Sequence, residues 1–197
     1  MPSFSEPIVA VTLTSNSLRG ITLYAPPWED TDGEEWQGFL GDGSKIVLLG
    51  TSAELAAWIE ANPDHDLADH PAWEAFAARG DEALQPDAAS SYDFDAVYEL
   101  AAGEADPHEV SRLADTVDMA TRVADCCEDG ALRSLLGNTR EYALLVEGET
   151  SYTGKDGAAE WESLGVVIAD TWERALNRIN TWLRWEGSAK TPIELAD

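Results

Sequence analysis

Two of the chain's three histidines lie in one short acidic stretch, DHDLADHPAWEAF (64–76). Imidazole and carboxylate groups hold zinc and act as general acids or bases, so one hypothesis is a metal-dependent enzyme that uses His65 and His70. The spacing argues against this hypothesis, because residues five apart do not share a helix face. Pro71 also indicates that a helix starts only after His70.

The same stretch has the features of a helix start. Asp69 or His70 can cap the helix, and Pro71 suits its first turn because proline has no N–H that needs a partner. Trp73 and Phe76 would then lie in the core. We therefore expect no bound metal at this stretch.

Other motifs for catalysis are absent from the sequence. The stretches GDGS (41–44) and GETSYTGKDG (148–157) match no phosphate-binding loop, and there is no GxSxG motif. Cys126 and Cys127 are the only cysteines and form no CxxC pattern, and Cys127 falls on a periodic apolar stripe. We expect no catalytic residues and no cofactor, and thus a protein that is not an enzyme.

The chain carries 38 acidic residues against 12 Lys and Arg, a formal net charge of −26. Binding to nucleic acid requires cations that replace the phosphate counterions, so direct DNA or RNA binding is disfavoured. The charge favours solubility, and it also fits a protein that attracts basic partners. One possible function is therefore an acidic nucleic-acid mimic or inhibitor that binds a basic partner.

The sequence also indicates a compartment. The N-terminus MPSFSEPIVAV lacks the basic segment and long apolar run of a signal peptide. No apolar run approaches the roughly 20 residues that a membrane-spanning helix needs. Two cysteines make no disulfide framework, which is typical of a reducing compartment. We expect a cytoplasmic protein without membrane insertion.

Strand patterns come first along the chain. Short β-branched and apolar segments predict four strands, at 8–13, 21–24, 35–40 and 45–49. GDGS between the last two is a hairpin signal, and the proline-rich and acidic stretch 25–35 predicts a loop.

Helix patterns follow. Thr51 and Glu54 form a capping-box pattern that opens a helix ending near residue 62, and Pro107 opens a longer helix. Residues 142–146 predict a strand or an extended connection. A further apolar stripe predicts a long helix over 156–185.

Strands followed by helices indicate an α+β fold. We expect a small antiparallel N-terminal sheet of about four strands, packed with a helical region that ends in a long C-terminal helix. The sheet and two helices would occupy 1–79, a polar linker 80–91, and the helical region 92–186. The alternative is one compact unit.

Six segments spread over most of the chain carry a family resemblance: LYAPPWEDTDGEEWQGFLG (23–41), TSAELAAWI (51–59), DHDLADHPAW (64–73), YDFDAVYELAA (92–102), VSRLADTVDMATRVADCCE (110–128) and YTGKDGAAEWESLGVVIADTWERAL (152–176). They resemble the N-terminal region of an actinobacterial family of SatS-type secretion chaperones, whose members are often labelled primosomal proteins. Longer members carry an additional C-terminal domain with client-holding apolar grooves. We expect this chain, which ends at residue 197, to lack it.

The resemblance implies a non-enzymatic cytoplasmic chaperone or adaptor for protein export through an accessory Sec pathway. Its partners would be client or export-pathway polypeptides. The tryptophan content agrees, because eight Trp in 197 residues is high and Trp is enriched where proteins bind one another. Our candidates for partner binding are Trp28 and Trp36 beside the acidic loop, and Trp182 and Trp185 at the end of the last helix.

Overall fold

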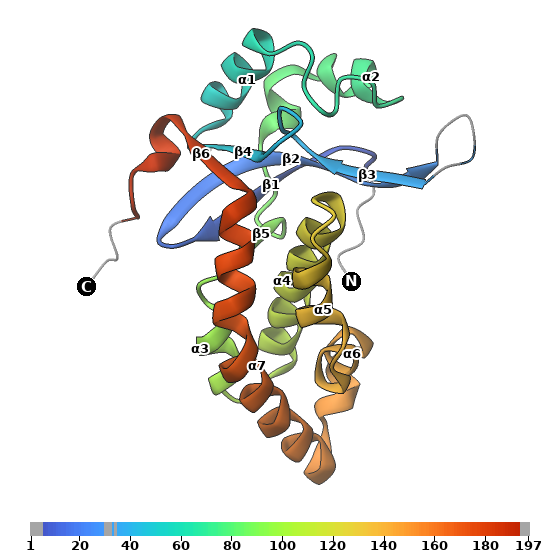
Figure 1. Ribbon diagram of the computed structural model, residues 1–197, viewed down its shortest axis with the longest axis vertical. Coiled ribbons are helices and arrows are strands. Elements are labelled where there is room, and N and C mark those ends of the chain that lie inside the picture. The colour runs from blue at the N-terminus through green and yellow to red at the C-terminus, as the bar shows by residue number, and fades with distance from the viewer. Residues whose placement is uncertain (1–5, 30–32, 34, 194–197) are drawn as a thin grey trace. The chain divides into compact units, whose positions relative to one another are not determined.

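The computed structural model describes residues 6–29, 33 and 35–193, and the chain divides into two compact units. The sheet unit comprises residues 3–92 and 182–197, and the helical unit comprises residues 93–181. The α+β fold expected from the sequence is confirmed (Figure 1). In chain order, the helical unit is inserted between the two segments that build the sheet unit.

The sheet contains six strands among the described residues: β1 (Val9–Ser15), β2 (Leu18–Glu29), β3 (Glu35–Phe39), β4 (Ile46–Leu49), β5 (Ser91–Asp93) and β6 (Leu183–Glu186). Their order is β5-β1-β2-β4-β6, and β3 also pairs with β2. A two-residue turn joins β1 to β2. Asn16 and Ser17 both have positive φ there, as a type I′ turn requires, and this turn matches the twist of a hairpin.

Two features of the sheet differ from the sequence prediction. β6 pairs parallel with β4, so the sheet is mixed rather than antiparallel. β2 continues through Pro26 and Pro27 to Glu29, where the sequence predicts a loop; residues 30–32 and 34 of that loop lie outside the described residues. Proline is tolerated on a strand edge that needs no N–H donor, and the pairing of β2 with β3 shifts register between Ala25 and Trp28.

The sheet unit also contains α1 (Ser52–Ala61), α2 (Trp73–Ala77) and the 3₁₀ helices η1 (Gly80–Leu84) and η3 (Gly187–Lys190). α1 and α2 lie over the sheet in Figure 1. Their buried side chains Leu55 and Phe76 join one core with residues from the strands, such as Leu23 and Val47. Residues 80–91, the predicted linker, include η1, and Leu84 is buried in the same core.

Glu54 connects the start of α1 to η3. The Thr51 hydroxyl accepts the Glu54 N–H at 3.1 Å, as the capping box predicts. The Glu54 carboxylate accepts the Gly50 N–H at 3.0 Å and the Ser188 hydroxyl at 2.9 Å. These hydrogen bonds, the one from the Ser188 hydroxyl foremost, hold the pKa of Glu54 below its ordinary value. Glu54 thereby fixes the turn that follows β6.

The helical unit contains α3 (Val97–Ala102), α4 (Pro107–Cys126), α5 (Gly130–Gly137), α6 (Arg140–Glu147), the 3₁₀ helix η2 (Glu149–Tyr152) and α7 (Gly154–Trp182). The predicted strand or extended connection at 142–146 is wrong, because these residues lie in α6. Thr139 caps α6, and its hydroxyl accepts the Tyr142 N–H at 3.4 Å. α7 is the predicted long helix but ends at Trp182, so Trp185 lies on β6 instead.

One face of α7 supplies much of the core of the helical unit. Its buried residues are spaced as predicted: Trp161, Leu164, Ile168, Trp172, Ala175 and Ile179. The indole N–H of Trp161 donates to the carbonyl of Gly103, and that of Trp172 to the carbonyl of Phe94, both at 2.9 Å. The two large rings are therefore buried with their polar atoms satisfied. Among the described residues, none of the helices has the combination of length and apolar content that a membrane span needs.

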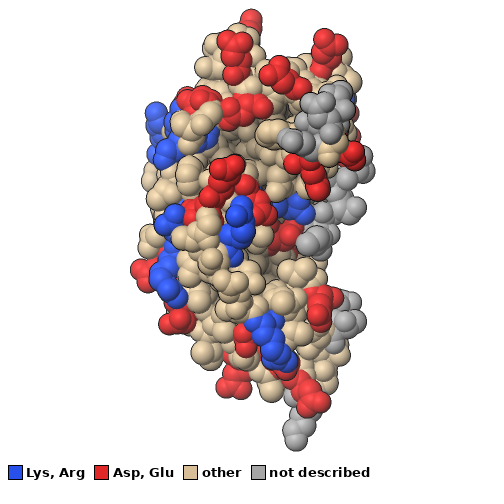
Figure 2. All heavy atoms as spheres, turned by 45° about the vertical axis from the view of Figure 1, so that its right-hand side comes forward, with Lys and Arg blue, Asp and Glu red and all other residues tan. Residues whose placement is uncertain are grey.

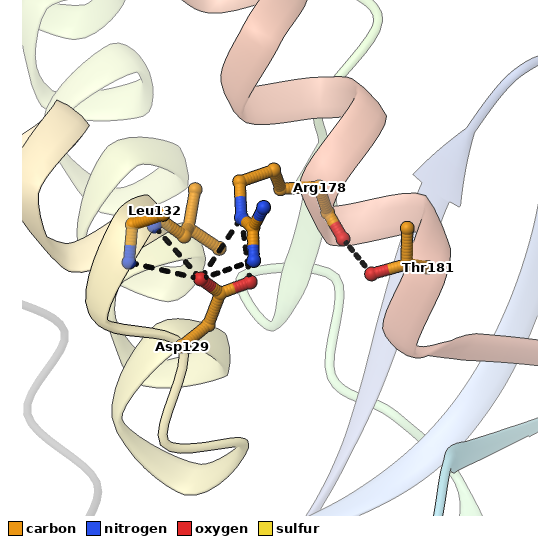
Figure 3. A network of polar contacts seen from close by, with 5 residues as sticks. Asp129, Leu132, Arg178 and Thr181 are labelled. Carbon is orange, nitrogen blue, oxygen red and sulfur yellow. Dashed lines mark hydrogen bonds and ion pairs between the residues drawn. The ribbon is translucent and has the colours of Figure 1, made fainter.

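A buried carboxylate links α5 to α7 (Figure 3). The Asp129 side chain is fully buried and accepts the N–H groups of Ala131 and Leu132, so it caps α5. Arg178 of α7 donates to the same carboxylate from Nε at 2.8 Å. Its own side chain is 45% exposed, so water still solvates part of the guanidinium.

We expect Asp129→Ala to lower the free energy of unfolding by about 2–3 kcal/mol, because it removes a helix cap and the partner of Arg178 together. Urea unfolding followed by circular dichroism measures this change. Asp170→Ala is the matched control: its carboxylate pairs with Arg174 on the same helix but is 80% exposed. If Asp129→Ala lowers the free energy of unfolding by no more than the control does, Asp129 is not the stabilising cap and ion-pair partner described here.

Candidate functional site

The structure brings two of the four predicted tryptophans together. Trp28 on β2 and Trp36 on β3 are directly paired across the strands, so both side chains lie on the same face. Trp28 is half-buried, and its ring packs edge-on against His70 with 4.3 Å between the centroids. Trp36 is 51% exposed, which makes it the most exposed of the described aromatic side chains. These strands place an aromatic surface at one end of the sheet.

The other two predicted tryptophans lie elsewhere in the sheet unit. Trp182 ends α7, and the Lys45 ammonium lies 6.0 Å from its ring centroid. Trp185 on β6 is half-buried opposite Leu48 of β4, and a Cβ at Gly20 would lie only 3.3 Å from its ring. Both rings thus pack within the sheet unit. The structure does not join them to Trp28 and Trp36, because β3 and β6 pair with different strands.

The two histidines of the opening stretch are buried. His65 Nδ1 accepts the Leu67 N–H at 3.2 Å, and the His65 ring packs edge-on against Trp73. His70 Nδ1 accepts the Ala72 N–H at 3.0 Å. The predicted helix start is corrected here: α2 begins at Trp73, and no side chain of a described residue caps it. Residues 64–72 instead form turns that the two imidazoles hold from inside.

These hydrogen bonds define the protonation of both rings. A nitrogen that accepts a hydrogen bond carries no proton, so each imidazole is neutral with its proton on Nε2. Burial lowers the pKa of His65 and of His70, and the nearby Asp66 carboxylate partly offsets this for His65. His70 Nε2 is buried and has no hydrogen-bond partner among the described residues. Within the described part of the chain, no three His, Cys, Asp or Glu residues are grouped to hold a metal.

The cysteines lie at the end of α4. Cys126 is its last residue and Cys127 its cap residue, and both are half-buried. The periodicity predicts Cys127 within the buried stripe; this is wrong, because Cys127 follows the last residue of α4 and is only half-buried. Burial, with smaller effects from Cys127 and Asp125, raises the pKa of the Cys126 thiol. A protonated thiol is a weak nucleophile.

The basic residues of the surface do little to reduce its negative charge, because most of the arginines are paired with carboxylates. Figure 2 shows acidic side chains spread over one face, with smaller basic groups beside them. Most arginines of the described residues pair with a carboxylate, as in Arg140–Glu160, Arg133–Asp125 and Arg184–Asp42. Paired arginines are locally neutralised, so the unpaired carboxylates dominate the field around the protein.

We expect the stability of the protein to fall as the pH drops below about 6.5, the ordinary pKa of histidine. The unfolded chain then binds protons that the folded chain, with its lowered histidine pKa values, does not yet bind. Replacing His65 and His70 by Asn, whose side-chain oxygen can accept the same backbone N–H, should flatten this dependence. Urea unfolding at pH 7.5 and 5.5 tests this prediction. His108→Asn, at an exposed site, is the control, and equal pH dependence in all variants would refute the role of the buried pair.

Comparison with known proteins gives two matches. The model of the SatS C-terminal domain family matches residues 8–180. A crystal structure of the SatS C-terminal domain in complex with bromine is similar, with a TM-score of 0.65 and 20% sequence identity over 91% of this chain and 94% of that chain. Identity this low shows a shared fold. No curated protein matches the chain.

These matches correct one expectation. The sequence segments suggest the N-terminal region of the family and a chain without the C-terminal domain. The matched family model describes the C-terminal domain itself, and it covers most of the chain.

Proposed function

Because the chain belongs to the SatS C-terminal domain family, we propose that it is a non-enzymatic cytoplasmic chaperone or adaptor for protein export. Its partners would be client or export-pathway polypeptides of an accessory Sec pathway. The family assignment carries this proposal. Since the matched domain is the one to which the resemblance attributes client holding, we favour holding of clients over docking of an export partner.

The physical properties of the chain support the same function. A protein that holds unfolded chains needs exposed apolar side chains on a body that does not aggregate. Large apolar side chains are exposed at five described positions: Trp36, Tyr98, Val146, Val166 and Ile193. The net charge of −26 opposes association between copies that carry such side chains.

An aggregation assay with an unfolded exported protein tests the proposal. We expect the chain to suppress light scattering near equimolar ratio, and Trp36→Ser to weaken the suppression because it removes the most exposed tryptophan. Tyr98→Ser, at another exposed aromatic ring, shows whether the loss is specific to Trp36. Absence of both suppression and detectable client binding would exclude the holding function.

The charge alone supports a second candidate, an acidic inhibitor that occupies a basic nucleic-acid-binding protein. In this case a tagged chain should retain such a protein from its native cytoplasm at physiological salt, and added DNA should compete for it. Retention of apolar, unfolded exported proteins that DNA does not displace would favour the chaperone instead.

A further inference from the structure

The β2–β3 ribbon (residues 25–29 of β2 and 35–39 of β3) projects from the sheet as two strands (Figure 1). Side chains alternate between the faces of a strand, so the pair Trp28–Trp36 and the next pair, Glu29–Glu35, lie on opposite faces. One face of the ribbon is therefore aromatic and the other acidic.

The acidic face carries an unfavourable pair. Glu29 and Glu35 are directly opposed across the strands, and like charges in this position destabilise a sheet. Both side chains are exposed, and neither has a hydrogen bond or an ion pair with a described residue. A cation placed between them would remove the repulsion.

The two edges of the ribbon differ in their capacity to bind another strand. On the β2 edge, Pro26 and Pro27 have no N–H to donate. β3 contains no proline, and among the described residues no strand other than β2 pairs with it. An edge of this kind offers N–H and C=O groups to an added strand.

We propose that β3 binds an extended segment of a partner polypeptide in which apolar and basic side chains alternate. The added strand would have the same alternation as the ribbon, so its apolar side chains would lie beside Trp36 and its Lys or Arg side chains beside Glu35, where they offset the repulsion between Glu35 and Glu29. Main-chain hydrogen bonds supply the affinity, and the alternating side chains supply the selectivity. This inference rests on the proposed function and specifies which client segments are bound.

A short acetylated and amidated peptide in which lysine and valine alternate is the probe, used with the whole chain. We expect it to shift the amide resonances of residues 35–39 and to protect them from hydrogen exchange. N-methylation of alternate valines should weaken binding about fivefold for each hydrogen bond removed. A peptide of the same composition with all lysines before all valines should also bind more weakly.

Glu35→Lys should weaken peptide binding about two- to fivefold, the effect of one exposed ion pair. Glu60→Lys is the matched control, because it makes the same change of charge at an exposed position of α1. Equal binding of the N-methylated peptide, equal weakening by both substitutions, or no peptide binding at all would overturn the inference. If the chain still suppresses client aggregation in those cases, the proposed function stands without it; if suppression is also absent, both fail.

Discussion

The sheet unit depends on the parallel pairing of β6 with β4. β6 follows the helical unit in the chain, so this pairing closes a loop that contains the whole helical unit, and such closure costs conformational entropy. Several contacts offset that cost. Arg184 of β6 pairs with Asp42, the ring of Trp185 fits over Gly20, and Ser188 binds Glu54. The three contacts come from one short segment, which keeps its register against β4 fixed.

Local signals in the sequence predict the elements whose stability is local. The Thr51–Glu54 capping box and Pro107 correctly mark the starts of α1 and α4, because caps and first turns depend on neighbouring residues. β6 could not be predicted in this way. Its residues continue the helical spacing of α7, and only pairing with a distant strand makes them extended. For α6, Thr139 as a cap residue and Gly148 just after the last turn are sequence signals that outweigh the strand-like pattern at 142–146.

The candidate site also combines features that neighbouring residues predict with features that depend on distant contacts. The sequence identifies Trp28 and Trp36 as surface candidates beside an acidic stretch, and the structure makes them a pair because a proline-containing segment is strand rather than loop. The contacts of His65 with Trp73 and of His70 with Trp28 have no sequence signal, since each depends on how turns fold over the sheet. Asp129 and Arg178 likewise lie far apart in the sequence and meet only in the folded helical unit.

The late position of β6 has a consequence for synthesis on the ribosome. Translation delivers β1 to β5 first, then the helices, and β6 last. Until α7 has been translated, β4 lacks its neighbour on one side, and its four buried apolar residues border an open edge. A nascent chain in that state is exposed to unwanted strand pairing, which is the hazard that exported polypeptides face before translocation. A protein proposed to protect other unfolded chains thus passes through a vulnerable stage of its own.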